Sequence, residues 1–163
     1  MRGFARSPRA NACSARIAAG LLLLMAIAPS WAVLGGDVSS IQVDQTRMRA
    51  QRESRAAVRE GTVHELRMPD GSSIRQFVNA NGIVYAVAWS TRLKPDFAQM
   101  LGRHAADFEA GVAAVSRSPG LTRSAEVDRG DLVVHSSGRP GAFVGQAWLK
   151  SLLPSGARTD AIR

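Results

Sequence analysis

Alternating apolar and polar positions mark the middle of the chain, between residues 62 and 90. Three runs with the two-residue period of a β-strand are separated by turn sequences at residues 69–71 (Pro-Asp-Gly) and 79–82 (Asn-Ala-Asn-Gly). Asparagine, aspartate and glycine tolerate the positive φ angles that tight hairpins require. The pattern therefore predicts a three-stranded antiparallel meander.

The third run, residues 83–89, is apolar at every position, which is typical of a strand in the centre of a sheet. Large side chains alternate along it with small ones, the large ones being Ile83, Tyr85, Val87 and Trp89 and the small ones Val84, Ala86 and Ala88. We expect the large side chains to share one face. The opposite face, with its small residues, is expected to admit a closely packed helix.

Helical periodicity follows over residues 96–116, where apolar residues recur every three to four positions after a capping box from Asp96 to Gln99. Gly102 and Gly111 weaken this helix, and residues 118–120 (Ser-Pro-Gly) end it. A first helix is predicted over residues 40–58. Its second half is rich in arginine and has few apolar residues to bury, so it is either a solvated helix or a segment that orders on binding.

Two further runs, within residues 131–148, predict a hairpin, after a polar stretch to residue 130 that is expected to be a surface loop. The fold class is therefore α+β. We predict an antiparallel sheet, made of the three-stranded meander and the hairpin, with one long amphipathic helix packed across it and an arginine-rich N-terminal helix. The predicted organisation is a signal peptide (1–32), an N-terminal segment with the basic helix (33–61), an α+β core (62–154) and a polar tail (155–163).

The first 32 residues have the pattern of a secretory leader. Arginines without any acidic residue precede a short apolar run at residues 17–28, and the small residues Ser30 and Ala32 stand where a signal peptidase reads. The run is shorter than the about 20 residues of a membrane-spanning helix. We expect export to the periplasm or the medium, and no transmembrane segment after cleavage behind Ala32.

Removal of this leader changes the charge and the available chemistry. The chain has a net charge of +8, but four of its 21 basic residues and none of its 13 acidic residues lie in the leader, which leaves 17 against 13, or +4. Nucleic acid is therefore not expected as a partner. Cys13, the only cysteine, is also lost. This excludes disulfides, thiolate zinc sites and cysteine nucleophiles from the mature chain, and no cofactor is expected.

Two groups of residues remain as candidates for chemistry. The three histidines (His64, His104 and His135) lack metal-ligand spacing, and each fits the pattern of a buried, hydrogen-bonded side chain. Binding of something anionic is the stronger candidate, since arginines recognise phosphate and carboxylate groups. The candidate binding residues are Arg47, Arg49, Arg52, Arg55 and Arg59, together with Trp89 and Trp148, which end apolar strands and are candidates to line a groove.

Several sequence segments, taken together, resemble those of a known family. They are Ala32-Val33-Leu34-Gly35, residues 64–71 (His-Glu-Leu-Arg-Met-Pro-Asp-Gly), residues 84–89, residues 96–102, Asp131-Leu132-Val133-Val134 and Leu152-Leu153-Pro154. On these the chain resembles a family of short exported proteobacterial proteins classed as a domain of unknown function. The resemblance implies export and a single domain, and it carries over no catalytic residue or ligand.

Three functional hypotheses follow. The first is a non-enzymatic periplasmic or secreted module that binds an envelope protein, a lipid or a glycan. The second is a hydrolase or metal-dependent enzyme that uses one or more of the three histidines. The third is an envelope-associated factor that docks on anionic lipid through its arginine-rich segment.

Overall fold

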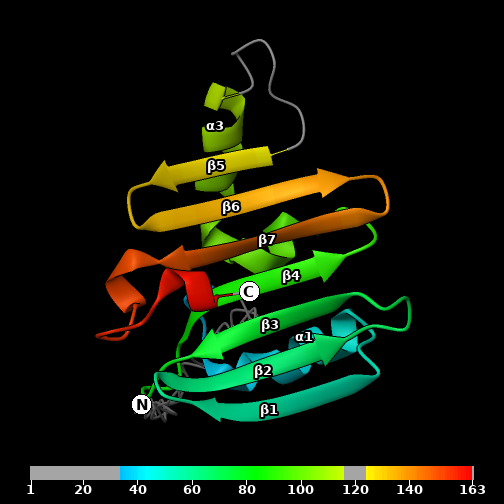
Figure 1. Ribbon diagram of the computed structural model, residues 1–163, viewed down its shortest axis with the longest axis vertical. Coiled ribbons are helices and arrows are strands. Elements are labelled where there is room, and N and C mark those ends of the chain that lie inside the picture. Colours follow the sequence, from blue (N-terminus) through cyan, green and yellow to red (C-terminus); the bar gives the residue numbers. More distant parts are fainter. Residues whose placement is uncertain (1–33, 116–123, 163) are drawn as a thin grey trace, which may run out of the picture.

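A seven-stranded antiparallel sheet organises the part of the chain that the computed structural model describes, residues 34–115 and 124–162. The predicted signal peptide and the predicted helix stop at residues 118–120 lie outside these ranges. The strand order is β1-β2-β3-β4-β7-β6-β5 (Figure 1). The strands are β1 (Arg52–Val58), β2 (Gly61–Arg67), β3 (Ser73–Val78), β4 (Val84–Thr91), β5 (Ser124–Arg129), β6 (Leu132–Arg139) and β7 (Ala142–Leu149).

Two meanders make up this sheet, β1 to β4 and β5 to β7, and they join where β4 pairs with β7. Both predicted turns of the first meander are present, with Gly71 and Gly82 at positive φ. Residues 84–89 of β4 are all buried, as expected of a central strand. The prediction of an α+β fold with an antiparallel sheet is therefore confirmed, although both meanders have one strand more than predicted.

The predicted helix over residues 40–58 is wrong beyond Arg47. The short η1 (Val38–Ser40) leads into α1 (Ile41–Arg47), and the chain then turns through Arg49, which has a φ of 51°. A left-handed residue ends a helix. The following residues have no apolar face with which a helix could pack on the core, and they form β1, which pairs with β2 along its whole length.

The second additional strand, β5, lies in the stretch that was expected to be a surface loop. Only Val127 is buried among its six residues, so its sequence has almost no alternation to reveal it. Pairing with β6 along its full length holds it in the sheet. The predicted hairpin is thus the inner part of a three-stranded unit.

Helices cover one face of the sheet, and this face holds the larger core cluster. The segment predicted as one long helix is helical throughout but divided, into α2 (Phe97–Leu101), η2 (Gly102–His104) and α3 (Ala105–Val115). Helix α3 packs on β5, where a Cβ at Gly111 would lie 2.4 Å from Val127 Cγ1. Gly111 therefore permits this close approach. In the described residues, no helix is long and apolar enough to span a membrane.

The assignment of β4 side chains to faces needs a correction at Tyr85. A register shift at Phe77 and Val78 leaves Tyr85 unpaired with β3, and such a bulge changes the face to which a side chain points. Tyr85 lies with Ala86 and Ala88 on the face opposite the helices, against Phe77. The helices pack on the face of Val84, Val87 and Trp89, so Val84 as well as Tyr85 lies on the face opposite to the one predicted, and the predicted helix on the small-residue face is wrong.

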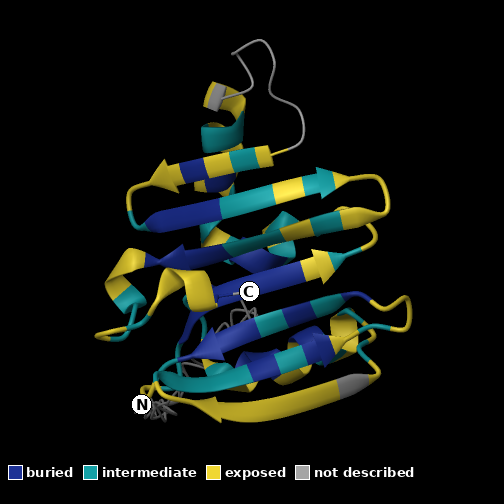
Figure 2. Cartoon of the chain, in the orientation of Figure 1, coloured by how far each residue is buried: buried dark blue, intermediate teal, exposed yellow. Residues whose placement is uncertain are grey.

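The face opposite the helices, hereafter the front face, is covered only in part. The C-terminal segment (residues 150–162) contains η3 (Lys150–Leu152) and η4 (Thr159–Ala161). It brings Ile162 into the second core cluster, beside Trp148 and Val133. Figure 2 shows the result: burial is greatest in the central strands and absent along the described part of β1.

Candidate functional site

Strand register sorts the side chains of the front face into three parallel rows. In an antiparallel sheet, paired residues point to the same face, and so do residues two apart on one strand. The first row is apolar on β3, β4, β7 and β6, with Phe77, Ala86, Trp148 and Val133 as successive partners. The C-terminal segment packs on this row.

The second and third rows run beside it and are polar. The mixed polar row consists, from β3 to β5, of Arg75, Ala88, Gln146, His135 and Glu126. The hydroxyl row consists, in the same strand order, of Ser73, Ser90, Val144, Ser137 and Ser124. The polar surface therefore begins where the cover of the C-terminal segment ends.

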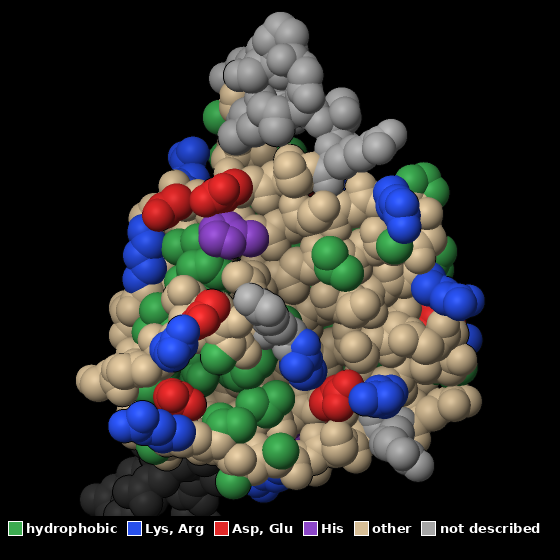
Figure 3. Space-filling view, viewed as in Figure 1, with side chains coloured by type: hydrophobic (Ala, Val, Ile, Leu, Met, Phe, Trp, Pro, Cys, Tyr) green, Lys and Arg blue, Asp and Glu red, His purple; other side chains and the backbone are tan. Residues whose placement is uncertain are grey.

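A cavity of about 520 Å³ lies over these two rows. Four residues of each row line it. The other lining residues, at positions 89, 125, 136 and 145, each stand on a strand between a residue of one row and a residue of the other. Small side chains explain the hollow: Ala88 lies between Arg75 and Gln146 in one row, and Ser90 and Ser137 lie on either side of Val144 in the other. The middle of this surface is mostly backbone and uncharged polar side chains (tan in Figure 3).

The two ends of the mixed polar row differ in charge. Arg75 supplies a cation on β3, and on β5 Glu126 Oε1 lies 3.4 Å from His135 Nε2. The His135 ring is in turn held edge-on against buried Trp148, with centroids 5.0 Å apart. Five adjacent strands span four gaps of about 4.8 Å, so the row extends over about 19 Å.

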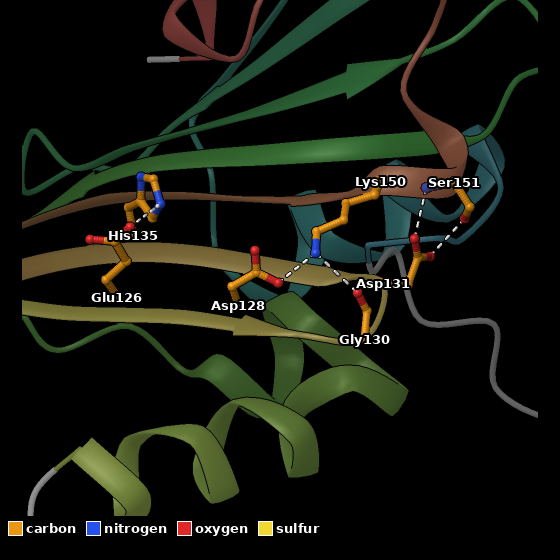
Figure 4. A network of polar contacts seen from close by, with 7 residues as sticks. All are labelled: Glu126, Asp128, Gly130, Asp131, His135, Lys150 and Ser151. Carbon is orange, nitrogen blue, oxygen red and sulfur yellow. Dashed lines mark hydrogen bonds and ion pairs between the residues drawn. The ribbon is translucent and has the colours of Figure 1, made fainter.

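Polar contacts hold the C-terminal segment in place over the apolar row, next to the cavity (Figure 4). Ser151 donates from both its backbone N–H and its hydroxyl to Asp131, at 2.7 Å each. Lys150 pairs with Asp128 and donates to the Gly130 carbonyl at 3.2 Å. The hydroxyl bond from Ser151 lowers the pKa of Asp131, so this anchor is ionised at neutral pH. The segment is thereby fixed over the apolar row.

Gly145, under the cavity, links the two faces of the sheet. A Cβ at this position would lie 2.4 Å from Trp89 Cζ2 and 2.5 Å from the His135 carbonyl oxygen. Trp89 thus packs on the bare backbone of β7 from the helical side. Its indole Nε1 is buried without a hydrogen-bond partner among the described residues.

The structure does not bring the predicted arginines to one helix face. Arg47 ends α1, Arg49 lies in the following turn, Arg52 and Arg55 belong to β1, and Arg59 follows β1. All five lie at the β1 end, away from the cavity, and anion binding by them stays a prediction.

The two predicted tryptophans are buried, on opposite faces of the sheet. Trp148, in the apolar row, contacts the His135 ring edge-on. Trp89 is among the residues that line the cavity, but it belongs to neither polar row. Their predicted role as groove-lining residues stays a prediction. Neither ring presents a broad exposed surface.

The three histidines lie on different elements, each with its own partner. His64 on β2 is buried, with Nδ1 3.0 Å from Glu53 Oε1. Arg103 donates to His104 Nε2 at 3.2 Å, and burial and this guanidinium lower the pKa of His104. His135 belongs to the cavity. In the described ranges, 34–115 and 124–162, no three potential metal ligands cluster.

Of the predicted binding residues, Trp89 lines the cavity, and the prediction missed the other residues that line it. Arg75, Ser90, Gln146 and Glu126 alternate correctly for one face of their strands, but only the pairing of β4 with β7 places them side by side. Alternation along β6 could have predicted part of this surface, because it places His135 and Ser137 on one face of the strand and Val134 on the other. The order of the strands was the missing information.

The fold and the cavity define an α+β domain with one polar, open sheet face. The chain belongs to the family described as protein of unknown function (DUF2844), whose model matches residues 30–162. The expected family membership is therefore confirmed at this level, and the description assigns no activity. Comparison with curated proteins and with solved structures finds no match.

Proposed function

We propose that this protein is a non-enzymatic binding module, exported to the periplasm or the medium, whose ligand lies across the open part of the front face. The observation that carries the proposal is the cavity of about 520 Å³ over two adjacent polar rows. Antiparallel sheets often leave one face to solvent. Here the small side chains of Ser90 and Ser137 lie beside the longer ones of the mixed polar row and leave a hollow that an extended molecule fills.

The chemistry of the rows favours a hydroxyl-rich ligand, that is, an oligosaccharide. Serine hydroxyls and the Gln146 amide both donate and accept hydrogen bonds, as sugar hydroxyls do. Arg75, at one end, suits the carboxylate of an acidic sugar. Glu126, at the other end, accepts hydrogen bonds from hydroxyl groups. With one cation and one carboxylate in the row, we expect hydrogen bonding to contribute more to binding than net charge does.

The proposal is tested by calorimetric titration of the protein with two series of oligosaccharides, one neutral and one containing uronic acids, from dimers to hexamers. We expect saturable binding that strengthens until the chain is long enough to reach from β3 to β5. Removal of the Gln146 amide in Gln146→Ala should weaken binding about tenfold, as the loss of hydrogen bonds in a binding site does. No saturable binding to either series would contradict the proposal.

Recovery of the ligand separates binding from catalysis. After prolonged incubation with the protein, a bound oligosaccharide should be recovered at its original length by mass spectrometry. Shortened products that disappear in a His135→Gln variant would overturn the non-enzymatic assignment in favour of the hydrolase hypothesis.

A further inference from the structure

Strand β1 is exposed on both faces as well as along its outer edge. Residues 53–58 are all exposed, including Val58 at 39%. Its neighbour β2, in contrast, buries His64 and Leu66. Among the described residues, β1 pairs with β2 alone. Residues 53–58 are therefore held in a strand although little of their surface is buried.

The two edges of the sheet differ in this respect. At the other edge, β5 buries Val127 against α3, which packs on this strand. The β1 edge has no such cover in the part of the chain that the structure describes. An exposed edge offers a row of backbone N–H and C=O groups that can pair with an added strand.

The charge along this edge favours an acidic partner. Two of the acidic side chains nearby are engaged: Glu53 contacts His64 at 3.0 Å, and Glu65 accepts from Arg67 at 3.1 Å. The side chains of Arg49, Arg55 and Arg59 are exposed and form no ion pair or hydrogen bond within the described residues. Three arginine side chains are thus available to a bound segment, and of the acids Glu53, Glu60 and Glu65, Glu60, in the turn after β1, is the one without such a contact in the described residues.

The second half of the strand is apolar and small. Ala56, Ala57 and Val58 follow Arg55, so side chains of an added strand meet an arginine on one part of the edge and small apolar residues on the other. We propose that β1 is the docking edge for an extended acidic segment of a partner protein, which adds to the sheet as a strand beside β1. This surface is separate from the cavity, at the opposite end of the sheet.

The test uses a heptapeptide in which glutamate and valine alternate, and a second peptide of the same charge with a central proline. We expect the first to bind and to slow hydrogen exchange of β1 amides, while those of β5 are unchanged. The proline peptide should bind about tenfold more weakly, because proline removes a backbone donor and disrupts strand pairing. Equal binding of both peptides would overturn strand addition.

Charge reversal identifies the surface. The double variant Arg55→Glu/Arg59→Glu should weaken peptide binding about tenfold at low salt. Arg139→Glu, an exposed arginine at the end of β6, is the matched control and should bind like the wild type. Flotation with phosphatidylglycerol vesicles gives the remaining outcome: vesicle binding that needs Arg55 and Arg59, without peptide binding, would overturn a protein partner in favour of an anionic membrane.

Discussion

Gln76 on β3 donates a hydrogen bond of 2.8 Å from Nε2 to Oδ2 of Asp44 on α1. Both residues are 2% exposed, so this contact fastens the helix to the sheet inside the core. Gln99, at the start of the helical segment that leads to α3, donates to the other carboxylate oxygen of Asp44 at 3.4 Å. Burial raises the pKa of Asp44 to about 6, against the lowering effect of these bonds.

The stability of the fold should therefore depend on pH through Asp44. The carboxyl group titrates near 3.8 when unfolded and near 6 when folded, so the folded state holds the proton more tightly. Its stabilising contribution is full below pH 3.8 and is lost as the pH rises through 6, by up to about 3 kcal/mol. Denaturant unfolding measured from pH 4 to 8 checks this.

The variant Asp44→Asn provides the control for that measurement. Asparagine keeps an oxygen that accepts from Gln76 Nε2 and has no proton to lose in this pH range. We expect Asp44→Asn to equal the wild type near pH 4, to exceed it in stability at pH 8, and to lose most of the pH dependence. An unchanged slope in the variant would assign the titration to another group.

Substitution of Gly111 by alanine should destabilise the protein although it improves the helix. Alanine gains about 1 kcal/mol in helix propensity, but its Cβ would lie 2.4 Å from Val127 Cγ1. Overpacking of this kind costs about 1–3 kcal/mol. In a Val127→Ala background, the same substitution should become stabilising. Thermal unfolding of the four proteins of this double-mutant cycle measures the coupling, and a Gly111→Ala effect that is equal in both backgrounds would refute the contact.

Export should leave a mature chain that begins at Val33. Expressed from its full sequence in a Gram-negative bacterium, the protein is expected outside the cytoplasm, with Ala32 as the last residue removed. N-terminal sequencing of the periplasmic and medium fractions checks this. A chain that retains residues 1–32 and fractionates with the cytoplasm would contradict the prediction.

Local sequence patterns predicted those elements whose residues have a clear periodicity. The turns at Gly71 and Gly82, the central strand of residues 84–89, and the extent of the helical segment from residue 97 all follow from alternation, turn residues and capping. Strands β1 and β5 were missed because they have almost no buried face, and their pairing partners are what keep them extended.

The cavity was not predictable from local patterns for a related reason. Arg75 and Gln146 are 71 positions apart in the chain and meet only because β4 pairs with β7 and because Ala88 stands between them. The bulge that places Tyr85 on the front face depends on a register shift against β3. Strand order and register are properties of the whole sheet, and they decide which side chains share this surface.

Filling the cavity is the most direct test of the central claim. Ser90 lies in the hydroxyl row beside Val144 and lines the cavity, so Ser90→Trp places a large ring in the hollow, whereas Ala110→Trp places the same ring on the exposed surface of α3. With the tightest-binding oligosaccharide, calorimetric titration should show binding lost in Ser90→Trp and unchanged in Ala110→Trp, with both proteins folded by circular dichroism. Undiminished binding by Ser90→Trp would place the ligand elsewhere and contradict the account.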